Sequence, residues 1–288
     1  MRWAPAALAL ALGCQRPPAR GPDDAGDAAQ APAATLRFRV EQGPARSLTL
    51  AALEAEVGAE TVAQYDPYYG RLKRFRALRL DRVLRVGFAG RGELARQQFV
   101  LRARDGYTVP LSGARLFEGG AYLAVRDLDR PGWEPIGPQR ADPGPLYLIW
   151  SRPEQTSLET HPRPWQLAEI EIARVETVFP HTAPPAGVVP AVTEGYALFV
   201  DRCLRCHAIN REGGRVGPEL NVPQNITQYR PEAQIRAYIR NPLQFRYGNM
   251  PPHPDLTEAD LDHLVAYLRV MADHRFDPTP RPDGGPAL

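Results

Sequence analysis

The chain has 288 residues, a hydrophobic fraction of 43% and a formal net charge of +2 at pH 7. This length allows two domains of ordinary size together with flexible segments. The small net charge gives no electrostatic basis for nucleic-acid binding. The three cysteines, Cys14, Cys203 and Cys206, are too few for the disulfide framework of a small secreted domain.

Residues 1–13 have the pattern of an export signal. Arg2 supplies a positive charge, and the apolar run over residues 3–12 is too short to span a bilayer as a helix. Residues 11–14, with the sequence Ala-Leu-Gly-Cys, resemble a bacterial lipoprotein box. The resemblance implies that Cys14 becomes the lipid-modified first residue of the mature chain. An ordinary cleaved signal with an incidental cysteine is the alternative.

The residues after Cys14 indicate which membrane would hold the lipid anchor and how the folded domains are tethered to it. Gln15 is not the aspartate that often retains bacterial lipoproteins in the inner membrane. The resemblance therefore favours attachment to the outer membrane, facing the periplasm. Residues 14–34 are rich in Pro, Ala, Gly and Asp, with almost no large apolar side chains, which predicts a disordered tether.

Residues 35–180 predict an α+β domain in which strands predominate. Residues 36–40 alternate between apolar and polar side chains, as in a half-buried strand, and Ser47 precedes a short helix expected over residues 48–57. A turn is expected over residues 66–70, and its two tyrosines either anchor the loop or mark a binding surface. Further strands are predicted over residues 98–103, 107–111, 121–125 and 146–150.

Helices dominate the expected structure of the last third of the chain. Residues 181–190 are rich in proline and predict a linker, and residues 191–276 predict a helical domain. Two of its helices are expected over residues 195–205 and 231–240. A third begins at Thr257, where Asp260 completes a capping box. The tail over residues 277–288 is again rich in proline and glycine and predicts a flexible end.

The sequence Cys-Leu-Arg-Cys-His at residues 203–207 is a C-x-x-C-H motif, the signature of c-type haem attachment. Two thiols one helical turn apart can add across the two vinyl groups on one edge of a porphyrin, and the adjacent imidazole can ligate the iron. A thioredoxin-type dithiol would lie in a βαβ context, which is absent here. A structural zinc site normally needs four Cys or His ligands. The motif therefore predicts one covalently bound haem c, held by Cys203 and Cys206.

The C-terminal block resembles class I c-type cytochromes over essentially its whole length. The resemblance is carried by Gly195, Phe199, the C-x-x-C-H motif, Gly-Pro-Glu-Leu at residues 217–220, Asn-Met-Pro-Pro at residues 249–252 and a terminal helix over residues 256–271. It implies an all-α fold in which His207 is the proximal ligand of the haem iron. It also implies that the Pro218 carbonyl accepts the ring N–H of His207, which fixes the histidine tautomer. Met250 is then the distal ligand.

Other side chains compete with Met250 for the distal position. Met271 lies inside the expected last helix, where a methionine more often fills the core. His253, His263 and His274 are alternative sixth ligands, and His253 is the rival nearest to Met250 in sequence. Two strong axial ligands leave no open position on the iron, which favours electron transfer over oxygen or peroxide chemistry.

The first domain resembles the molybdopterin-binding domain of the sulfite oxidase superfamily. The resemblance is carried by short sequence segments at residues 105–107, 119–125, 144–149 and 165–178. Enzymes of that superfamily hold molybdenum through a cysteine thiolate, and residues 35–180 contain no cysteine. The resemblance therefore implies a binding or docking module without bound molybdopterin or molybdenum catalysis. An unrelated α+β domain is the alternative.

These features predict a multidomain protein with a strand-rich α+β domain followed by an all-α class I cytochrome c domain. The leading hypothesis is a monohaem electron carrier, lipid-anchored in the bacterial periplasm, that exchanges single electrons with redox partner proteins and is not itself an enzyme. One alternative is a sulfite-oxidase-like molybdoenzyme with the haem as its electron exit. Another is a haem-bearing subunit of a larger oxidoreductase complex. Arg236, Arg240 and Arg246 form either a basic docking patch or a solvated face.

Overall fold

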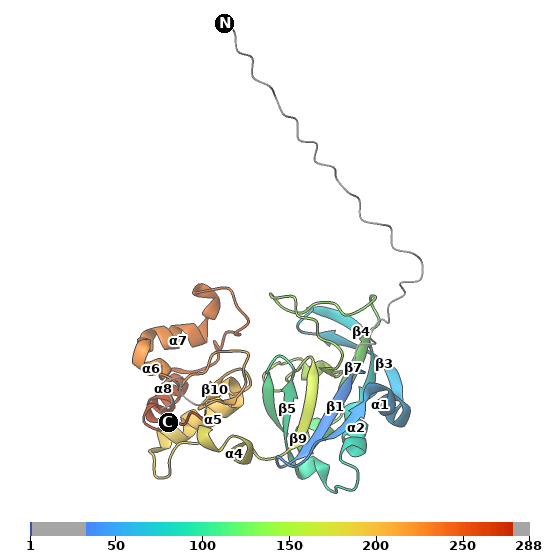
Figure 1. Ribbon diagram of the computed structural model, residues 1–288, viewed down its shortest axis with the longest axis horizontal. Helices are drawn as coiled ribbons and strands as arrows, with labels where there is room; N and C mark the ends of the chain where they lie inside the picture. The colour runs from blue at the N-terminus through green and yellow to red at the C-terminus, as the bar shows by residue number, and fades with distance from the viewer. Residues whose placement is uncertain (2–32, 279–288) are drawn as a thin grey trace. The chain divides into compact units, whose positions relative to one another are not determined.

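Two β-sheets form the first domain (Figure 1). The five-stranded sheet has the order β2-β1-β9-β5-β6, in which β1 runs parallel to β9 and antiparallel to β2. Its strands are β1 (Thr35–Val40), β2 (Arg46–Thr49), β5 (Gln98–Ala103), β6 (Thr108–Ser112) and β9 (Leu167–Ile172). The four-stranded sheet has the order β3-β4-β7-β8, with strands β3 (Ala59–Asp66), β4 (Arg71–Arg79), β7 (Ala121–Asp127) and β8 (Tyr147–Trp150).

Short helices connect these strands. They are α1 (Leu50–Val57), α2 (Leu80–Gly87), α3 (Gly113–Phe117), α4 (Val175–Val178) and the 3-10 turns η1 (Leu94–Arg96), η2 (Pro153–Gln155) and η3 (Pro180–Thr182). The computed structural model describes Met1 and residues 33–278. All of the expected signal at residues 1–13 except Met1, together with Cys14, nearly all of the tether at residues 14–34 and most of the tail, therefore lies outside the described residues.

Buried and exposed side chains alternate along parts of the strands, which gives each sheet a face to bury against the core. From Val62 to Asp66 of β3 and from Lys73 to Ala77 of β4 every second side chain is buried, as the two-residue repeat of a strand requires. The main core gathers residues from both sheets and the helices, including Phe38, Phe99 and Trp150. The predicted α+β character is thus present, and the strands expected at residues 98–103, 107–111, 121–125 and 146–150 appear as β5, β6, β7 and β8 with small shifts of their ends.

The first helix begins later than the sequence predicts. Ser47 was expected to precede a helix over residues 48–57, but Leu48 instead lies in β2, opposite Leu36 of β1. The helix α1 starts at Leu50, and the Thr49 hydroxyl caps it by accepting the N–H of Ala52 at 3.2 Å. Cross-strand pairing with a distant segment decided this boundary, which local capping signals could not reveal.

The second domain is mostly helical. Its elements are α5 (Pro190–Leu198), the π-helix η4 (Phe199–Cys203), β10 (Ala208–Ile209), β11 (Glu212–Gly213), α6 (Ile226–Tyr229), α7 (Glu232–Arg240), η5 (Pro242–Gln244) and α8 (Glu258–Ala272). The predicted capping box is present, since Thr257 and Asp260 bond reciprocally at the start of α8. The helix predicted over residues 195–205 is wrong in form: α5 begins at Pro190 and gives way to a π-helical turn. The short β10–β11 pair departs from a purely helical fold.

The predicted linker is partly packed rather than free. Thr182 is fully buried, and its carbonyl accepts the hydroxyl of Tyr267 from α8 at 2.7 Å. Val100 of β5 belongs to the same hydrophobic cluster as Phe199 and Tyr267. The described residues from 34 to 278 accordingly belong to one compact unit. Among the described residues, no helix is both long enough and apolar enough to cross a membrane.

Helices α5 and α8 make a close crossing, and they lie together in Figure 1. A Cβ added to Gly195 would lie 2.0 Å from the backbone oxygen of His263 in α8. Because backbone cannot yield as a flexible side chain can, only glycine fits at this position. The spacing of these two helices therefore depends on Gly195.

Gly195→Ala should lower the free energy of unfolding of the second domain by about 1–3 kcal/mol, the usual cost of forcing a methyl group into a packed contact. Thermal or denaturant unfolding would measure the change. Gly248→Ala is the matched control, because a Cβ there meets nothing within 4 Å. Equal stability of the two variants would contradict this account of the crossing.

Candidate functional site

The C-x-x-C-H motif forms a tight turn directly after the π-helical turn η4. The N–H groups of Cys206 and His207 both donate to the carbonyl of Cys203, at 3.0 and 2.8 Å. The N–H of Gly217 donates to the Cys206 carbonyl at 2.7 Å. Local backbone bonds thus bring both thiols and the imidazole into one turn, and the later segment carrying Gly217 folds back onto it.

The two thiols have the wrong electrostatics for a dithiol redox pair. Cys203 and Cys206 are free cysteines. Burial raises the pKa of the Cys203 thiol to about 12 and that of Cys206 to about 11. Reactive C-x-x-C pairs rely on a lowered thiol pKa, because the thiolate is the nucleophile. The zinc alternative also lacks support, since the described residues hold no group of three or more His, Cys, Asp or Glu side chains placed for a metal ion.

The ring of His207 has a defined tautomer. Its Nδ1 lies 2.9 Å from the carbonyl oxygen of Pro218, the contact that the resemblance to class I cytochromes implies. A carbonyl oxygen only accepts, so Nδ1 carries the proton and Nε2 keeps its lone pair. Burial lowers the pKa of His207, with His253 acting in the same direction and the Pro218 bond opposing it. A neutral imidazole with a free Nε2 is the form that ligates a metal.

Glycines let the returning segment lie against the motif. A Cβ added to Gly217 would lie 2.5 Å from Cε1 and 2.7 Å from Nδ1 of the His207 ring. Gly213 has φ of 122°, and a Cβ there would lie 2.5 Å from the His207 carbonyl oxygen. Both positions therefore require glycine, one for space and one for space and backbone conformation.

The carboxylate of Glu219 holds this segment together, a role that sequence reasoning missed. It accepts backbone N–H groups of Asn210, Arg211, Asn221 and Val222, at 3.0, 2.9, 2.8 and 3.1 Å. Four such bonds to one ionised side chain are strong hydrogen bonds. Glu219 follows Pro218 directly, so it fixes the carbonyl on which the His207 ring depends. No local sequence pattern marks a carboxylate that serves a turn nine residues earlier.

The described structure separates the candidate distal ligands into two groups. Met271 is 1% exposed within the core, and His263 and His274 lie along and just after α8. Met250 is half-buried in the segment between η5 and α8. His253 is 5% exposed and close enough to His207 to lower its pKa. Met250 and His253 both lie in the segment between η5 and α8, so Met250 stays a prediction with His253 as its rival.

The predicted turn at residues 66–70 is present, and its tyrosines are anchored. The Asp66 carboxylate accepts the N–H of Tyr68 at 3.0 Å. The Tyr68 ring meets Trp165 edge to face, with ring centroids 5.1 Å apart. The Tyr69 hydroxyl donates to the carbonyl of Glu134 at 2.6 Å. These contacts support the loop-anchor interpretation.

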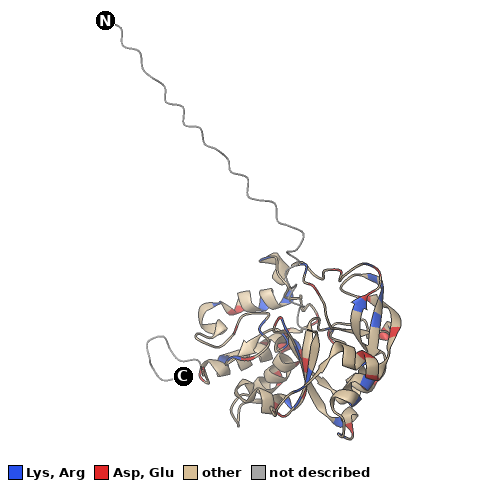
Figure 2. Ribbon diagram, turned by 45° about the vertical axis from the view of Figure 1, so that its right-hand side comes forward, with Lys and Arg blue, Asp and Glu red and all other residues tan. Residues whose placement is uncertain are grey.

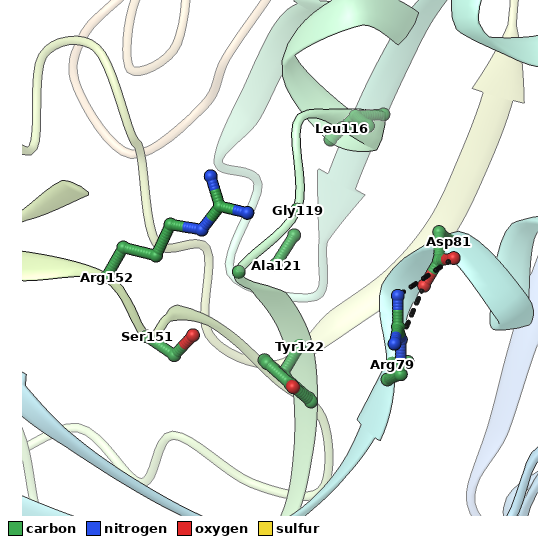
Figure 3. A pocket seen from close by; sticks show the side chains of 9 residues that line it. Arg79, Asp81, Leu116, Gly119, Ala121, Tyr122, Ser151 and Arg152 are labelled. Carbon is green, nitrogen blue, oxygen red and sulfur yellow. Dashed lines mark hydrogen bonds and ion pairs between the residues drawn. The ribbon is translucent and has the colours of Figure 1, made fainter. Parts of the chain in front are cut away.

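The first domain carries a cavity of about 230 Å³ (Figure 3). Arg79, Ser151 and Arg152 line it, and Arg79 is paired with Asp81 at 3.1 Å. The Arg152 guanidinium lies over Gly119, where an added Cβ would come within 2.5 Å of it. The lining contains neither cysteine nor histidine. The cavity therefore offers no thiolate of the kind that holds molybdenum in sulfite oxidase-type enzymes.

Two of the three arginines of the suggested basic patch, Arg236 and Arg240 on α7, are neutralised, whereas Arg246 donates to the Tyr238 hydroxyl at 2.7 Å. Arg236 pairs with Glu232 and Asp262, and Arg240 pairs with Glu258 at 2.7 Å. Figure 2 shows the same interleaving of basic and acidic residues along the other elements. Exposed pairs of this kind contribute little to stability. They leave a solvated face rather than a concentrated positive surface.

Comparison with known proteins supports the assignment of the second domain. Residues 190–268 match the family described as cytochrome c oxidase, cbb3-type, subunit III. The chain is also 36% identical over 86 residues to cytochrome c oxidase subunit 2 of Alkalihalophilus pseudofirmus, a match that covers 27% of this chain and 25% of that subunit. The C-terminal part of the chain is therefore a c-type cytochrome domain, which implies haem binding. The described residues fit that group, with two free thiols and an imidazole whose Nε2 lone pair is available.

Gly217→Ala should displace the His207 ring, because the new methyl group would overlap it. We expect haem to stay covalently attached through the two cysteines while the axial bands of the absorption spectrum change and the midpoint potential shifts. Spectroelectrochemistry would measure both. Gly92→Ala is the control here, because a Cβ at Gly92 meets nothing within 4 Å and the residue is far in sequence from both expected iron ligands. An unchanged spectrum and potential would show that Gly217 does not position the ring.

Proposed function

We propose that this chain is a monohaem c-type cytochrome, lipid-anchored in the bacterial periplasm, that transfers single electrons between redox partner proteins. The observation that supports it best is the His207 ring, held by Pro218 at 2.9 Å beside two free thiols. A cytochrome domain suggests electron transfer, and the exported compartment agrees with the signal-like residues 1–13 and with Cys14 as the site of the lipid.

Each residue of the site has a distinct role in this proposal. Cys203 and Cys206 would hold the haem through thioether bonds, each formed when an S–H adds across one vinyl group. His207 would bind the iron through Nε2, while Pro218 keeps the proton on Nδ1. Met250 would supply the second protein ligand. The haem iron supplies a one-electron Fe(II)/Fe(III) couple, whose potential a thioether ligand raises.

A second candidate is a haem-bearing subunit of a larger oxidoreductase complex. The matched family and the matched protein are both described as subunits of cytochrome c oxidase, which favours this candidate. The two candidates differ in partner permanence, so purification from the native membrane separates them: a complex that survives salt and dilution indicates a subunit. A molybdenum enzyme has less support, because residues 35–180 contain no cysteine.

Cys203→Ala and Cys206→Ala should each weaken or abolish covalent haem attachment, because one of the two thioether bonds is lost. The measurements are the mass of the denatured chain and its iron and molybdenum content after maturation in a host competent in haem attachment. Stoichiometric iron without molybdenum is expected for the wild type. Normal covalent haem in both variants, or no iron in the wild type, would refute the cytochrome assignment. Stoichiometric molybdenum would make the first domain an enzyme.

Met250→Ala should lower the midpoint potential and open the sixth position to added ligands such as imidazole, while haem stays attached. His253→Ala is the matched comparison, because His253 is the rival ligand. Potentiometry and ligand titration distinguish them. An altered spectrum in the His253 variant, with no change in the Met250 variant, would reverse the assignment.

A further inference from the structure

The first domain reaches the haem-attachment segment with its backbone. The N–H of Thr108 donates to the carbonyl of Arg205 at 2.9 Å, and the N–H of Arg215 donates to the carbonyl of Gly106 at 2.9 Å. Gly106 has φ of 93°, and a Cβ there would lie 2.9 Å from the Cβ of Arg215. The turn between β5 and β6 therefore lies in backbone contact with the residues that flank and separate the two cysteines.

A single carboxylate of the first domain faces two arginines and one histidine ring of the second. Glu159 lies 3.1 Å from Arg202, 3.9 Å from Arg205 and 3.9 Å from His253. The Arg205 guanidinium also donates to the carbonyl of Leu158 at 3.2 Å. The side chain of Arg205 is only 11% exposed, so its charge is poorly solvated and its pairing is strengthened.

The two arginines differ in how many other carboxylates pair with them. Arg202 also pairs with Asp201 at 2.8 Å and with Asp255 at 3.1 Å. Among the described residues, the carboxylate within ion-pair distance of Arg205 is that of Glu159 alone. Buried nitrogens of Arg205 and His253 lack a hydrogen-bond partner there as well. Glu159 is therefore the carboxylate that pairs with Arg205 inside the contact, at 3.9 Å and without a hydrogen bond to its Oε2.

Neighbouring side chains of the first domain extend the contact. Tyr107 lies between Gly106 and Thr108, the two residues whose backbone bonds reach the second domain. Val100 of β5 packs in the core of the second domain with Phe199 and Leu204. The contact is therefore continuous rather than a single ion pair.

We propose that the first domain is a fixed cover over the haem-attachment segment and that Glu159 is the positioning residue that keeps this cover closed. Electron partners then reach the haem from a face of the second domain that the first domain leaves open. The statements about haem access and haem potential rest on the proposed function, whereas the contact between the domains is made by residues of this chain alone.

Glu159→Gln in the haem-loaded full chain tests the proposal, because it removes the charge and keeps the shape. Hydrogen exchange at the amides of Thr108 and Arg215 should become roughly tenfold faster, since their bonds cross the contact. The amide of Leu101 inside β5 should not change. The midpoint potential should rise, because loss of a negative charge near the haem disfavours the oxidised, more positive state.

Glu154→Gln is the matched control. It lies in η2, close to Glu159 in sequence, and is exposed. We expect wild-type exchange and potential from it, and Glu159→Asp, which restores the charge, should recover most of the wild-type behaviour. If Glu159→Gln does not fold, Arg205→Gln tests the same pair from the other side.

Unchanged amide exchange at Thr108 and Arg215 in charge-removing variants that retain haem would overturn the cover. Faster exchange without any shift of potential would overturn the positioning role of Glu159 toward the haem. Absence of covalent haem in the wild type would refute the proposed function instead, and the exchange result would still decide whether the contact exists.

Discussion

The hydrogen bond between the Nδ1 of His207 and the carbonyl of Pro218, 2.9 Å long, is the constraint on which the site depends. An imidazole that is free to turn offers either nitrogen to a metal, and in either tautomer. One carbonyl acceptor removes that freedom by fixing the proton on Nδ1 and aiming Nε2 the other way. The bond is useful only if the carbonyl itself is held, and the surrounding segment supplies that support.

The support is a set of buried polar contacts rather than a hydrophobic cluster. Glu219 ties the backbone on both sides of Pro218, including the turn at Asn210, whose φ is 57°. The buried amides of Asn210, Asn221 and Asn225 bond to one another at 2.7 Å, and Asn225 continues to the carbonyl of Leu268 in α8 at 2.8 Å. A buried polar chain of this kind is stable only when every member is satisfied. The ligand orientation is thereby linked to α8, the helix that Gly195 allows to pack against α5.

Sequence reasoning succeeded where the determinant was local. The capping box of Thr257 and Asp260, the alternation in β1 and the C-x-x-C-H motif all depend on residues within a few positions of one another. It failed where a distant partner decided the outcome. Leu48 joined a strand because Leu36 was available to pair with it. The expected linker was fixed because buried groups of α8 and β5 pack around it. The roles of Glu219 and Glu159 were missed for the same reason. A single glutamate in a sequence does not show that it will accept backbone N–H groups, as Glu219 does, or pair with arginines, as Glu159 does.

The two domains are therefore in contact, although the amino-acid composition along the chain suggests that they are separate. A proline-rich stretch between a strand-rich and a helical region indicates independent domains, yet Thr182 is fully buried and backbone bonds join Thr108 to Arg205. With both domains in place the side chain of Arg205 is only 11% exposed, and a partly buried charge without a partner is costly. The first domain that covers Arg205 also supplies a carboxylate, that of Glu159 at 3.9 Å, which offsets this cost. The residue between the two cysteines is thus packed against the first domain as well as its own.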